Sequence, residues 1–191
     1  LTRGLGAGMN PDVGKQAAEE NRSEVGEALE GSDVVFITAG MGGGTGTSAS
    51  PIIADVSREK GILTVGIVTK PFLFEGAQRG TIAQEGIARL KEKVDALVVI
   101  PNDRIFGLID KDTPMFRAFA FIDDVLKNSV KAIAELINIP GLINIDFADI
   151  KTILKDAGPT LIGIGVASGA DRSIKAVQAA VNSPLLEISV D

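Results

Sequence analysis

Cysteine and histidine are both absent from this sequence of 191 residues. Without cysteine, the chain has no disulfide framework and no thiol chemistry. Without histidine, it has no histidine-based catalytic triad and lacks the commonest metal ligand. No apolar run approaches the roughly 20 residues that a membrane-spanning helix needs, and no secretory signal is visible. We therefore expect no direct insertion into a membrane.

Acidic residues outnumber basic ones by 25 to 19, which gives a formal net charge of -6. Because the lysines are scattered, this balance argues against nucleic acid as the main partner. The hydrophobic fraction of 45% allows a sizeable core, and the length fits one domain or one domain and part of another. These features predict a soluble, cytoplasmic protein. The first residue is Leu1 rather than methionine, so we expect a fragment.

A glycine-rich stretch, Gly40–Ser48, has the sequence GMGGGTGTS. The apolar run Val34–Thr38 before it predicts a buried strand, and the segment Pro51–Arg58 after it predicts a helix. Strand, glycine-rich loop and helix in this order are typical of a phosphate site in an α/β fold. Glycines allow the backbone to approach an anion, and the helix dipole directs its positive end there. Thr45 and Thr47 would add hydroxyl donors.

The alternative for this stretch is a flexible linker, but linkers rarely lie between a buried strand and a helix of one domain. The stretch is not a P-loop, because it lacks G-x-x-x-x-G-K-[ST] and the phosphate-binding lysine of that motif. It is not the G-x-G-x-x-G of a dinucleotide site either. The sequence therefore predicts a phosphate site built from main-chain amides and hydroxyl groups.

Apolar runs alternate with helical segments along the first hundred residues. We predict buried strands at 33–38, 62–68 and 96–100, and helices at 10–30, 51–60 and 77–94. This alternation predicts an α/β fold with a parallel sheet and helices on both faces. The glycine-rich loop, Glu75 and Asn102 each follow the end of a strand. Because ligands bind at the carboxyl ends of parallel strands, we expect these groups to meet at one edge.

A long helix is predicted at 114–138, with Thr113 as its cap. Most of its positions are apolar, so we expect it to be covered on most sides. Asp123 lies outside its polar stripe and near Phe119, one turn earlier. A carboxylate in apolar surroundings needs a partner, although a lone, partly exposed aspartate is the alternative.

Asp146 and Asp149 precede a predicted helix that runs to about residue 156. The pair fits a capping pattern, which is enough to explain both residues locally. A strand at 160–166 and a helix at 170–182 are predicted to follow.

Six motifs occur in a fixed order: LGAGMNP, GGGTGTS, KPFLFEG, IPND, DVLKNSVKAIAELI and GLINIDFADI. In this order and spacing they resemble the bacterial FtsZ family, the tubulin-like GTPases of cell division, over nearly the whole chain. The resemblance implies a GTP-binding domain over 1–112 and a central helix over 113–138. It implies a catalytic loop and the start of a second, α+β domain over 139–191.

The resemblance also implies which residues hold the phosphates. The loop that faces the γ-phosphate would contain Ala7, Gly8 and Asn10. The phosphates themselves would be held by Gly43, Gly44, Thr45, Gly46 and Thr47. Mg²⁺ would offset the phosphate charge, since it prefers oxygen ligands and keeps several waters.

For the sugar and base, the resemblance implies Glu75 at the ribose hydroxyls and Arg79 near the sugar and phosphates. The guanine would be held by Asn102, Phe119 and Asp123. The chemistry agrees, because a carboxylate can accept both the N1–H and the N2–H of guanine, whereas adenine has an acceptor at N1. Phe119 would stack on the base, and ordinary core packing is its alternative.

Hydrolysis needs a group that orients or activates water, and the phosphate loop contains no histidine, lysine or acid. In the FtsZ family the next subunit of a filament supplies it, from a loop that matches Asn144, Asp146 and Asp149. The resemblance therefore implies a head-to-tail homopolymer whose active site is complete only after assembly. It further implies a cytoplasmic ring at midcell and division adaptor proteins bound through a C-terminal tail.

Two departures from the family pattern affect these expectations. Ser48 replaces a glycine, and we expect its Cβ to lie beside the phosphates and hinder their approach. The resemblance also implies that this chain lacks the family's first strand and diphosphate loop, most of its second domain and its C-terminal tail. We therefore expect weak GTP binding and poor hydrolysis by the chain alone.

Two other functions remain open at this point. A nucleotide-dependent dehydrogenase would need a fingerprint after a strand, and none is visible. A tubulin-like scaffold that binds nucleotide without hydrolysing it is the non-enzymatic alternative. The presence of both Asp146 and Asp149 argues against the scaffold.

Overall fold

The computed structural model describes residues 2–107, 112–139, 146–163 and 165–182. Four parallel strands form one sheet in the order β1 (Val34–Gly40), β2 (Leu63–Lys70), β3 (Ala96–Pro101) and β4 (Gly158–Pro159). β2 is central, and its residues up to Thr69 are buried. The prediction of a parallel α/β sheet is confirmed.

The strand predicted at 160–166 is wrong. Pairing with β3 involves only Gly158 and Pro159, and Thr160 N then donates to Leu97 O at 2.8 Å. Two of the apolar residues that suggested a strand, Leu161 and Val166, are exposed, whereas Ile162 is partly buried against the core.

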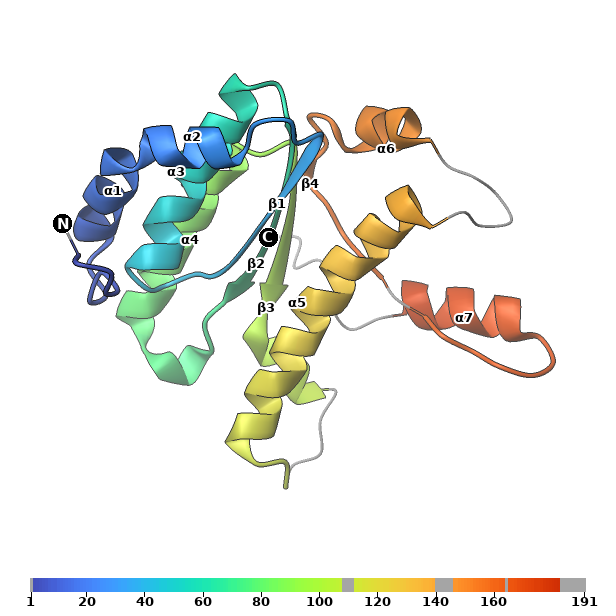
Figure 1. Ribbon diagram of the computed structural model, residues 1–191. Coiled ribbons are helices and arrows are strands. Elements are labelled where there is room, and N and C mark those ends of the chain that lie inside the picture. The colour runs from blue at the N-terminus through green and yellow to red at the C-terminus, as the bar shows by residue number, and fades with distance from the viewer. Residues whose placement is uncertain (1, 108–111, 140–145, 164, 183–191) are drawn as a thin grey trace.

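Helices cover both faces of the sheet, as predicted. On one face lie α3 (Thr45–Glu59) and α4 (Ala77–Lys91), and on the other lie α5 (Met115–Asn138) and α6 (Phe147–Leu154) (Figure 1). The two faces have separate cores because side chains alternate along each strand. Val68 of β2 packs with α3 and α4, whereas Ile67 faces α5.

The helix predicted at 10–30 is two helices, α1 (Pro11–Glu20) and α2 (Arg22–Ala28). The break is at Asn21, whose side-chain amide donates to Ala17 O at 2.7 Å. Asparagine competes for main-chain carbonyls in this way, which explains the interruption. Both helices pack outside α3 and form a further layer.

α3 begins at Thr45, six residues before the predicted start, so Pro51 lies inside the helix. The second half of the glycine-rich stretch is therefore the first turn of a helix rather than a loop. At its other end, the helix stops before Gly61, which has a positive φ of 72°.

α5 is 24 residues long, close to the prediction. Pro114, not Thr113, occupies the cap position, and no side chain caps the helix. The expectation that α5 is covered on most sides is wrong. Its buried residues form one stripe, in which Ile133 packs on the sheet and Ile122 packs on Phe72, whereas Phe116 is exposed.

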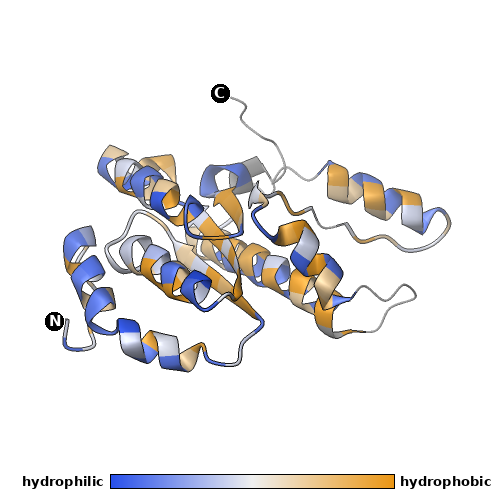
Figure 2. Ribbon diagram, turned by 90° about the horizontal axis from the view of Figure 1, so that it is seen from above, coloured by the Kyte–Doolittle hydropathy of each residue, from blue (hydrophilic) through white to orange (hydrophobic). Residues whose placement is uncertain are grey.

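The remaining helix, α7 (Arg172–Val181), lies within the predicted range and projects from the sheet (Figure 1). Apolar residues run along it, and Ile174, Val177 and Val181 are exposed (Figure 2). Among the described residues, none of the helices has the length and apolar character to cross a membrane.

A glycine sets how closely α4 approaches α3. A Cβ on Gly86 would collide with the Thr47 side chain and come within 3.2 Å of Thr47 O. Thr47 is fully buried at this contact, so it has no free space in which to move. The helices can pack at this distance only because position 86 lacks a side chain.

Asp55 of α3 links α2 to the residues just after α4 through a network of ion pairs. Its carboxylate accepts from Lys93 Nζ at 2.6 Å and from Arg22 Nη2 at 2.8 Å. Arg22 Nη2 also lies 2.7 Å from Glu59 Oε1. The hydrogen bond from Lys93, followed by that from Arg22, lowers the pKa of Asp55 below its ordinary value of 3.8.

We predict that Gly86→Ala destabilises the fold by about 1–3 kcal/mol, because overpacking outweighs the better helix propensity of alanine. Gly80→Ala on the same helix is the matched control, since a Cβ added at Gly80 would have no atom within 4 Å. It should be neutral or stabilise by up to about 1 kcal/mol. Denaturant unfolding of both variants measures this, and equal stabilisation would contradict the packing described here.

We predict that Asp55→Asn lowers the free energy of unfolding by about 1 kcal/mol at neutral pH, since two partly exposed pairs are lost. A carboxylate with a lowered folded-state pKa stabilises the fold above its unfolded pKa. Its contribution is lost as the pH falls through the folded value. The difference from the parent chain should therefore shrink as the pH falls below about 4. The control is Asp33→Asn, an exposed carboxylate without an ion pair in the described structure. A difference that does not change with pH would refute the assignment.

Candidate functional site

The carboxyl ends of β1, β2 and β3 open onto a cavity of about 280 Å³. Six of the predicted site residues line it: Gly43, Glu75, Arg79, Asn102, Phe119 and Asp123. They come from four separate segments of the chain. This convergence follows from parallel pairing, which brings the strand ends to one edge.

The other residues around the cavity were not predicted: Gly40, Met41, Thr69, Pro71, Ile122 and Leu126. Gly40 and Thr69 lie at the ends of β1 and β2, so the strand-end rule could have identified them. Ile122 and Leu126 could have been found from their helical spacing with Phe119 and Asp123, since residues three and four apart share a helix face.

Two buried polar atoms of the cavity residues have no hydrogen-bond partner among the described residues. They are Nε of Arg79 and Oδ1 of Asn102, and Asn102 is only 6% exposed. Buried polar groups are almost always paired, because an unpaired one costs about 1–3 kcal/mol. A donor and an acceptor left unpaired beside one cavity indicate that a polar ligand belongs there.

Glu75 lies in the 3₁₀ turn η1 (Leu73–Glu75), and its carboxylate is held from two sides. Oε1 accepts from Phe72 N at 2.9 Å, and Oε2 forms an ion pair with Arg79 Nη1 one turn along α4. Both contacts leave lone pairs on the two oxygens, so the carboxylate can still accept hydrogen bonds from a ligand.

Phe119 and Asp123 lie one turn apart on α5. The Phe119 ring is 44% exposed and meets the buried Phe72 ring edge to face, at 5.5 Å between centroids. Phe119 is therefore not simply a core residue, because one part of its surface is open. Asp123 is exposed rather than enclosed in apolar surroundings.

The glycine-rich stretch is held against the chain's first loop. Ala7 N donates to Thr45 Oγ1 at 3.1 Å. A Cβ on Gly44 would come within 2.9 Å of Ala7 Cβ and 2.8 Å of Asn10 N, so glycine is needed there. Gly8 has a positive φ of 59° and is exposed.

Asn10 caps α1, since its Oδ1 accepts from Asp12 N at 3.0 Å and Val13 N at 3.4 Å. The N-terminus of α3, in contrast, has no side-chain cap. Its first N–H groups belong to Thr45, Gly46 and Thr47. Free N–H groups at a helix N-terminus suit an anion.

The side chains of Thr47 and Ser48 point into the protein. Thr47 Oγ1 accepts from Gly42 N at 2.9 Å and so shapes the turn before the helix. Ser48 Oγ donates to Gly44 O at 2.5 Å and faces Gly14 of α1. The expectation that the Ser48 side chain lies beside the phosphates is therefore wrong, because it packs between two helices.

Asp146 and Asp149 lie at the other end of the sheet, at the start of α6 (Figure 1). Both are exposed. Asp146 occupies the cap position, and its O accepts from Asp149 N at 3.0 Å, but its side chain forms no cap hydrogen bond. Asn144 lies outside the described residues.

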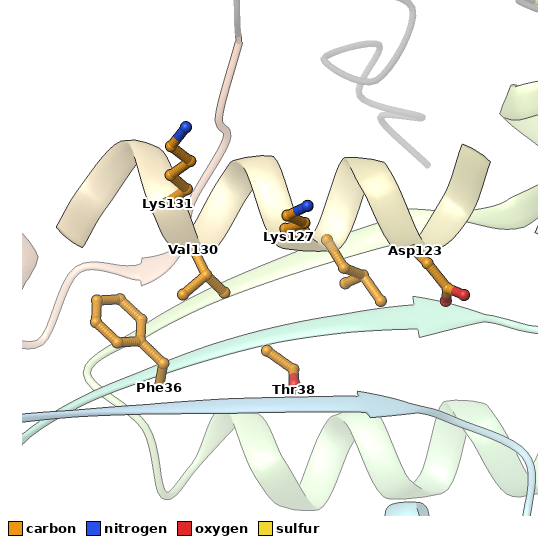
Figure 3. A pocket seen from close by; sticks show the side chains of 7 residues that line it. Phe36, Thr38, Asp123, Lys127, Val130 and Lys131 are labelled. Carbon is orange, nitrogen blue, oxygen red and sulfur yellow. The ribbon is translucent and has the colours of Figure 1, made fainter. Parts of the chain in front are cut away.

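A second hollow of about 640 Å³ runs between β1 and α5. Figure 3 shows Phe36 and Thr38 of the strand opposite Val130 and Asp123 of the helix, with the ammonium group of Lys131 directed away from the sheet. Although four of its lining residues are polar, the surface that faces the hollow is mainly apolar. Because no unpaired buried polar atom of the described residues lies there, its chemistry favours a nucleotide less than the smaller cavity does.

The described residues contain no group of three or more acidic side chains that could hold a metal ion without help. The acids that line the cavity are Glu75, which is paired with Arg79, and Asp123. A cation that accompanies phosphate would therefore depend on phosphate oxygens and water.

Comparison with known proteins gives a consistent result. Residues 1–110 match the model of the Tubulin/FtsZ family, GTPase domain. An FtsZ structure from M. jannaschii, described as an empty dimer, has 49% identity and a TM-score of 0.94 over 100% of this chain. A mutant FtsZ from the same organism also has 49% identity, with a TM-score of 0.93. CetZ from Methanosaeta thermophila, at 24% identity and a TM-score of 0.73 over 94% of this chain and 50% of its own, shares the fold.

This chain spans 55% and 57% of the two FtsZ chains. Both come from an archaeon, so the bacterial origin expected from the motifs stays a prediction. The family match covers more than half of this chain, and the high identity extends over all of it. The chain therefore belongs to the Tubulin/FtsZ family, whose GTPase domain it carries.

Proposed function

We propose that this chain binds a guanine nucleotide between the glycine-rich stretch and the cavity at the strand ends. The observation that carries the proposal is the cavity itself, which combines two unpaired buried polar atoms, an open aromatic ring and a carboxylate. Its volume of about 280 Å³ is near the lower end of small-ligand sites, about 300–1,000 Å³. The base and sugar would fill it, and the phosphates would lie over the N-terminus of α3.

The base would be recognised by Asp123, Asn102 and Phe119. The Asp123 carboxylate would accept from N1–H and N2–H of guanine, and Asn102 Oδ1 would gain the partner it lacks. The open part of the Phe119 ring would stack on the base. Adenine would leave the carboxylate facing an acceptor, which costs binding energy.

The sugar and phosphates would extend from the cavity toward the first turn of α3. Glu75 would accept from the ribose hydroxyls, and Arg79 would lie between the sugar and the phosphates. Main-chain N–H groups of Gly43, Gly44, Thr45 and Gly46 would hold the phosphate oxygens, with Ala7, Gly8 and Asn10 toward the γ-phosphate. Thr47 would contribute its N–H, since its side chain points inward.

Mg²⁺ would bind here only together with phosphate, because the described residues contain no cluster of acidic side chains that could hold the ion without it. When bound, Mg²⁺ would neutralise the phosphate charge while keeping water ligands.

Hydrolysis would be completed by a second copy of the chain. Glu75 of the cavity is already paired with Arg79, whereas Asp146 and Asp149 are exposed at the opposite end of the sheet. One copy cannot bring these ends together, whereas head-to-tail contact can, with Asn144 in the same loop. Repetition of that contact without closure makes a filament. The dimer described for an FtsZ relative is consistent with self-association.

At the level of the whole protein, the proposed role is a filament that forms the cytoplasmic division ring at midcell. Adaptor proteins would bind through a C-terminal tail. This part depends on the similarity to FtsZ, since the chain covers about half of those relatives. A scaffold that binds nucleotide without hydrolysis is the alternative. Sedimentation with GTP and GDP, together with phosphate release, distinguishes the two: filaments that persist without phosphate release favour the scaffold.

We predict that Asp123→Asn weakens GDP binding by about 10- to 100-fold, as loss of a charged hydrogen bond costs about 1.5–3 kcal/mol. Binding of ADP should change little. Calorimetric titration of both nucleotides measures the effect. The control is Asp124→Asn, the exposed neighbour, which removes the same charge. Equal affinities of the parent chain for ADP and GDP would contradict the proposed recognition of guanine.

We predict that Asp149→Ala leaves GDP affinity unchanged and lowers GTP turnover by about 100-fold or more, the usual contribution of an acid–base group. Phosphate release is measured at protein concentrations at which the parent chain assembles. Mixing Asp149→Ala with Asp123→Asn should restore part of the turnover, because the first has an intact pocket and the second an intact acid. Absence of any recovery in the mixture would argue against a shared site.

A further inference from the structure

We propose that Asp103 is a positioning residue that aligns the sugar-binding Glu75 with the base-binding Asn102. The proposal rests on the proposed function, because it concerns how one ligand is held by two segments. The geometry that carries it is a hydrogen bond from Leu73 N to Asp103 Oδ1, at 3.2 Å. This bond joins turn η1, which contains Glu75, to η2 (Asn102–Gly107), which begins with Asn102.

Turn η1 is held by main-chain hydrogen bonds and by a ring contact with the residue before it. Its own main-chain bonds run from Glu75 N to Phe72 O at 3.0 Å and from Gly76 N to Leu73 O at 3.2 Å. These bonds close the turn but do not attach it to the sheet. The Leu73 side chain is 84% exposed. The Phe74 ring is partly exposed and stacks on Phe72, the residue just before the turn, at 4.9 Å between ring centroids.

Two other contacts restrain the same turn from different directions. Phe72, just before it, is buried at 1% exposure and packs against Phe119. Glu75, at its end, pairs with Arg79 of α4. Neither contact connects the turn to the end of β3. Asp103 makes this connection by accepting from the N–H of Leu73, which lies between Phe72 and Glu75 in the sequence.

The position of Asp103 in the sequence makes the connection short. Pro101 ends β3, Asn102 lines the cavity, and Asp103 is the next residue. The amide of Asn102, which would face the base, and the carboxylate of Asp103, which holds η1, thus belong to consecutive residues. Any movement of η1 away from Asp103 changes the separation between Glu75 and Asn102, which one nucleoside must bridge.

The test compares GDP with 2′,3′-dideoxy-GDP by calorimetric titration of the full chain. The ratio of their Kd values reports the contribution of the ribose hydroxyls. The parent chain should prefer GDP, and Glu75→Gln should lower this preference. Asp103→Ala should lower it by about tenfold, which corresponds to about 1.4 kcal/mol. Asp103→Asn should retain it, because the amide oxygen still accepts from Leu73 N.

The double variant Glu75→Gln with Asp103→Ala measures whether the two residues act together on the preference for GDP. If Asp103 acts through Glu75, the double variant should lose no more preference than Glu75→Gln alone. Asp124→Asn controls for the loss of one negative charge near an anionic ligand. In the ligand-free chain, the Leu73 amide should exchange faster with solvent in Asp103→Ala than in Asp103→Asn.

The outcomes separate this inference from the proposed function. A preference for GDP that survives Asp103→Ala, or that is lost equally in Asp103→Asn, overturns the positioning role while guanine binding stands. Additive losses in the double variant also overturn it. If the parent chain binds neither GDP nor its dideoxy analogue, the proposed function fails and this inference fails with it.

Discussion

Parallel pairing of β1, β2 and β3 is the constraint on which the rest of this structure depends. It requires each strand to be followed by a crossover, so every strand end at one edge opens into a loop or helix start. The glycine-rich stretch, turn η1 and the start of η2 are three such segments. None is near the others in sequence, yet all contribute to one cavity. The apolar strands hold this arrangement, since β2 is buried on both faces.

The chemistry at that edge is unusual in how little of it comes from free charged side chains. Arg79 and Glu75 are paired with each other, and lysine is absent from the described cavity lining. In the proposed site, phosphate would be bound by main-chain N–H groups at the uncapped start of α3. Glycines at positions 14 and 44 permit the close packing that holds this helix start in place. The proposed phosphate site would therefore draw its polarity mainly from the backbone, whereas side chains supply the polar groups of the cavity.

Much of this architecture could be predicted from the sequence, because burial and periodicity are local signals. The three long strands and the crossover helices follow from apolar runs between glycine and proline signals. The rule that ligands bind at the carboxyl ends of parallel strands also predicted that Glu75 and Asn102 lie at one edge of the sheet. The side-chain directions of Thr47 and Ser48 could not be predicted in this way. They depend on the contacts with Gly86 and Gly14, which exist only once α3 has packed against α4 and α1.

Two other differences have the same origin. Leu161 and Val166 are apolar residues typical of a strand, but a strand needs a partner along its whole length, and in this segment only Gly158 and Pro159 pair with β3. α5 has the composition of a covered helix, yet only one stripe of it meets the sheet. In each case apolar content was taken as burial, whereas burial depends on what else lies nearby.

The first turn of α3 has a double role that reaches beyond recognition. The residues whose N–H groups face the proposed phosphates also begin a helix whose side chains, such as Ala54, lie in the core. A ligand that binds the folded chain and not the unfolded one adds to stability by mass action, by about 2.7 kcal/mol at a hundredfold excess over Kd. The nucleotide would thus act as a folding cofactor, so that the lifetime of the folded chain in a cell would follow the supply of guanine nucleotide.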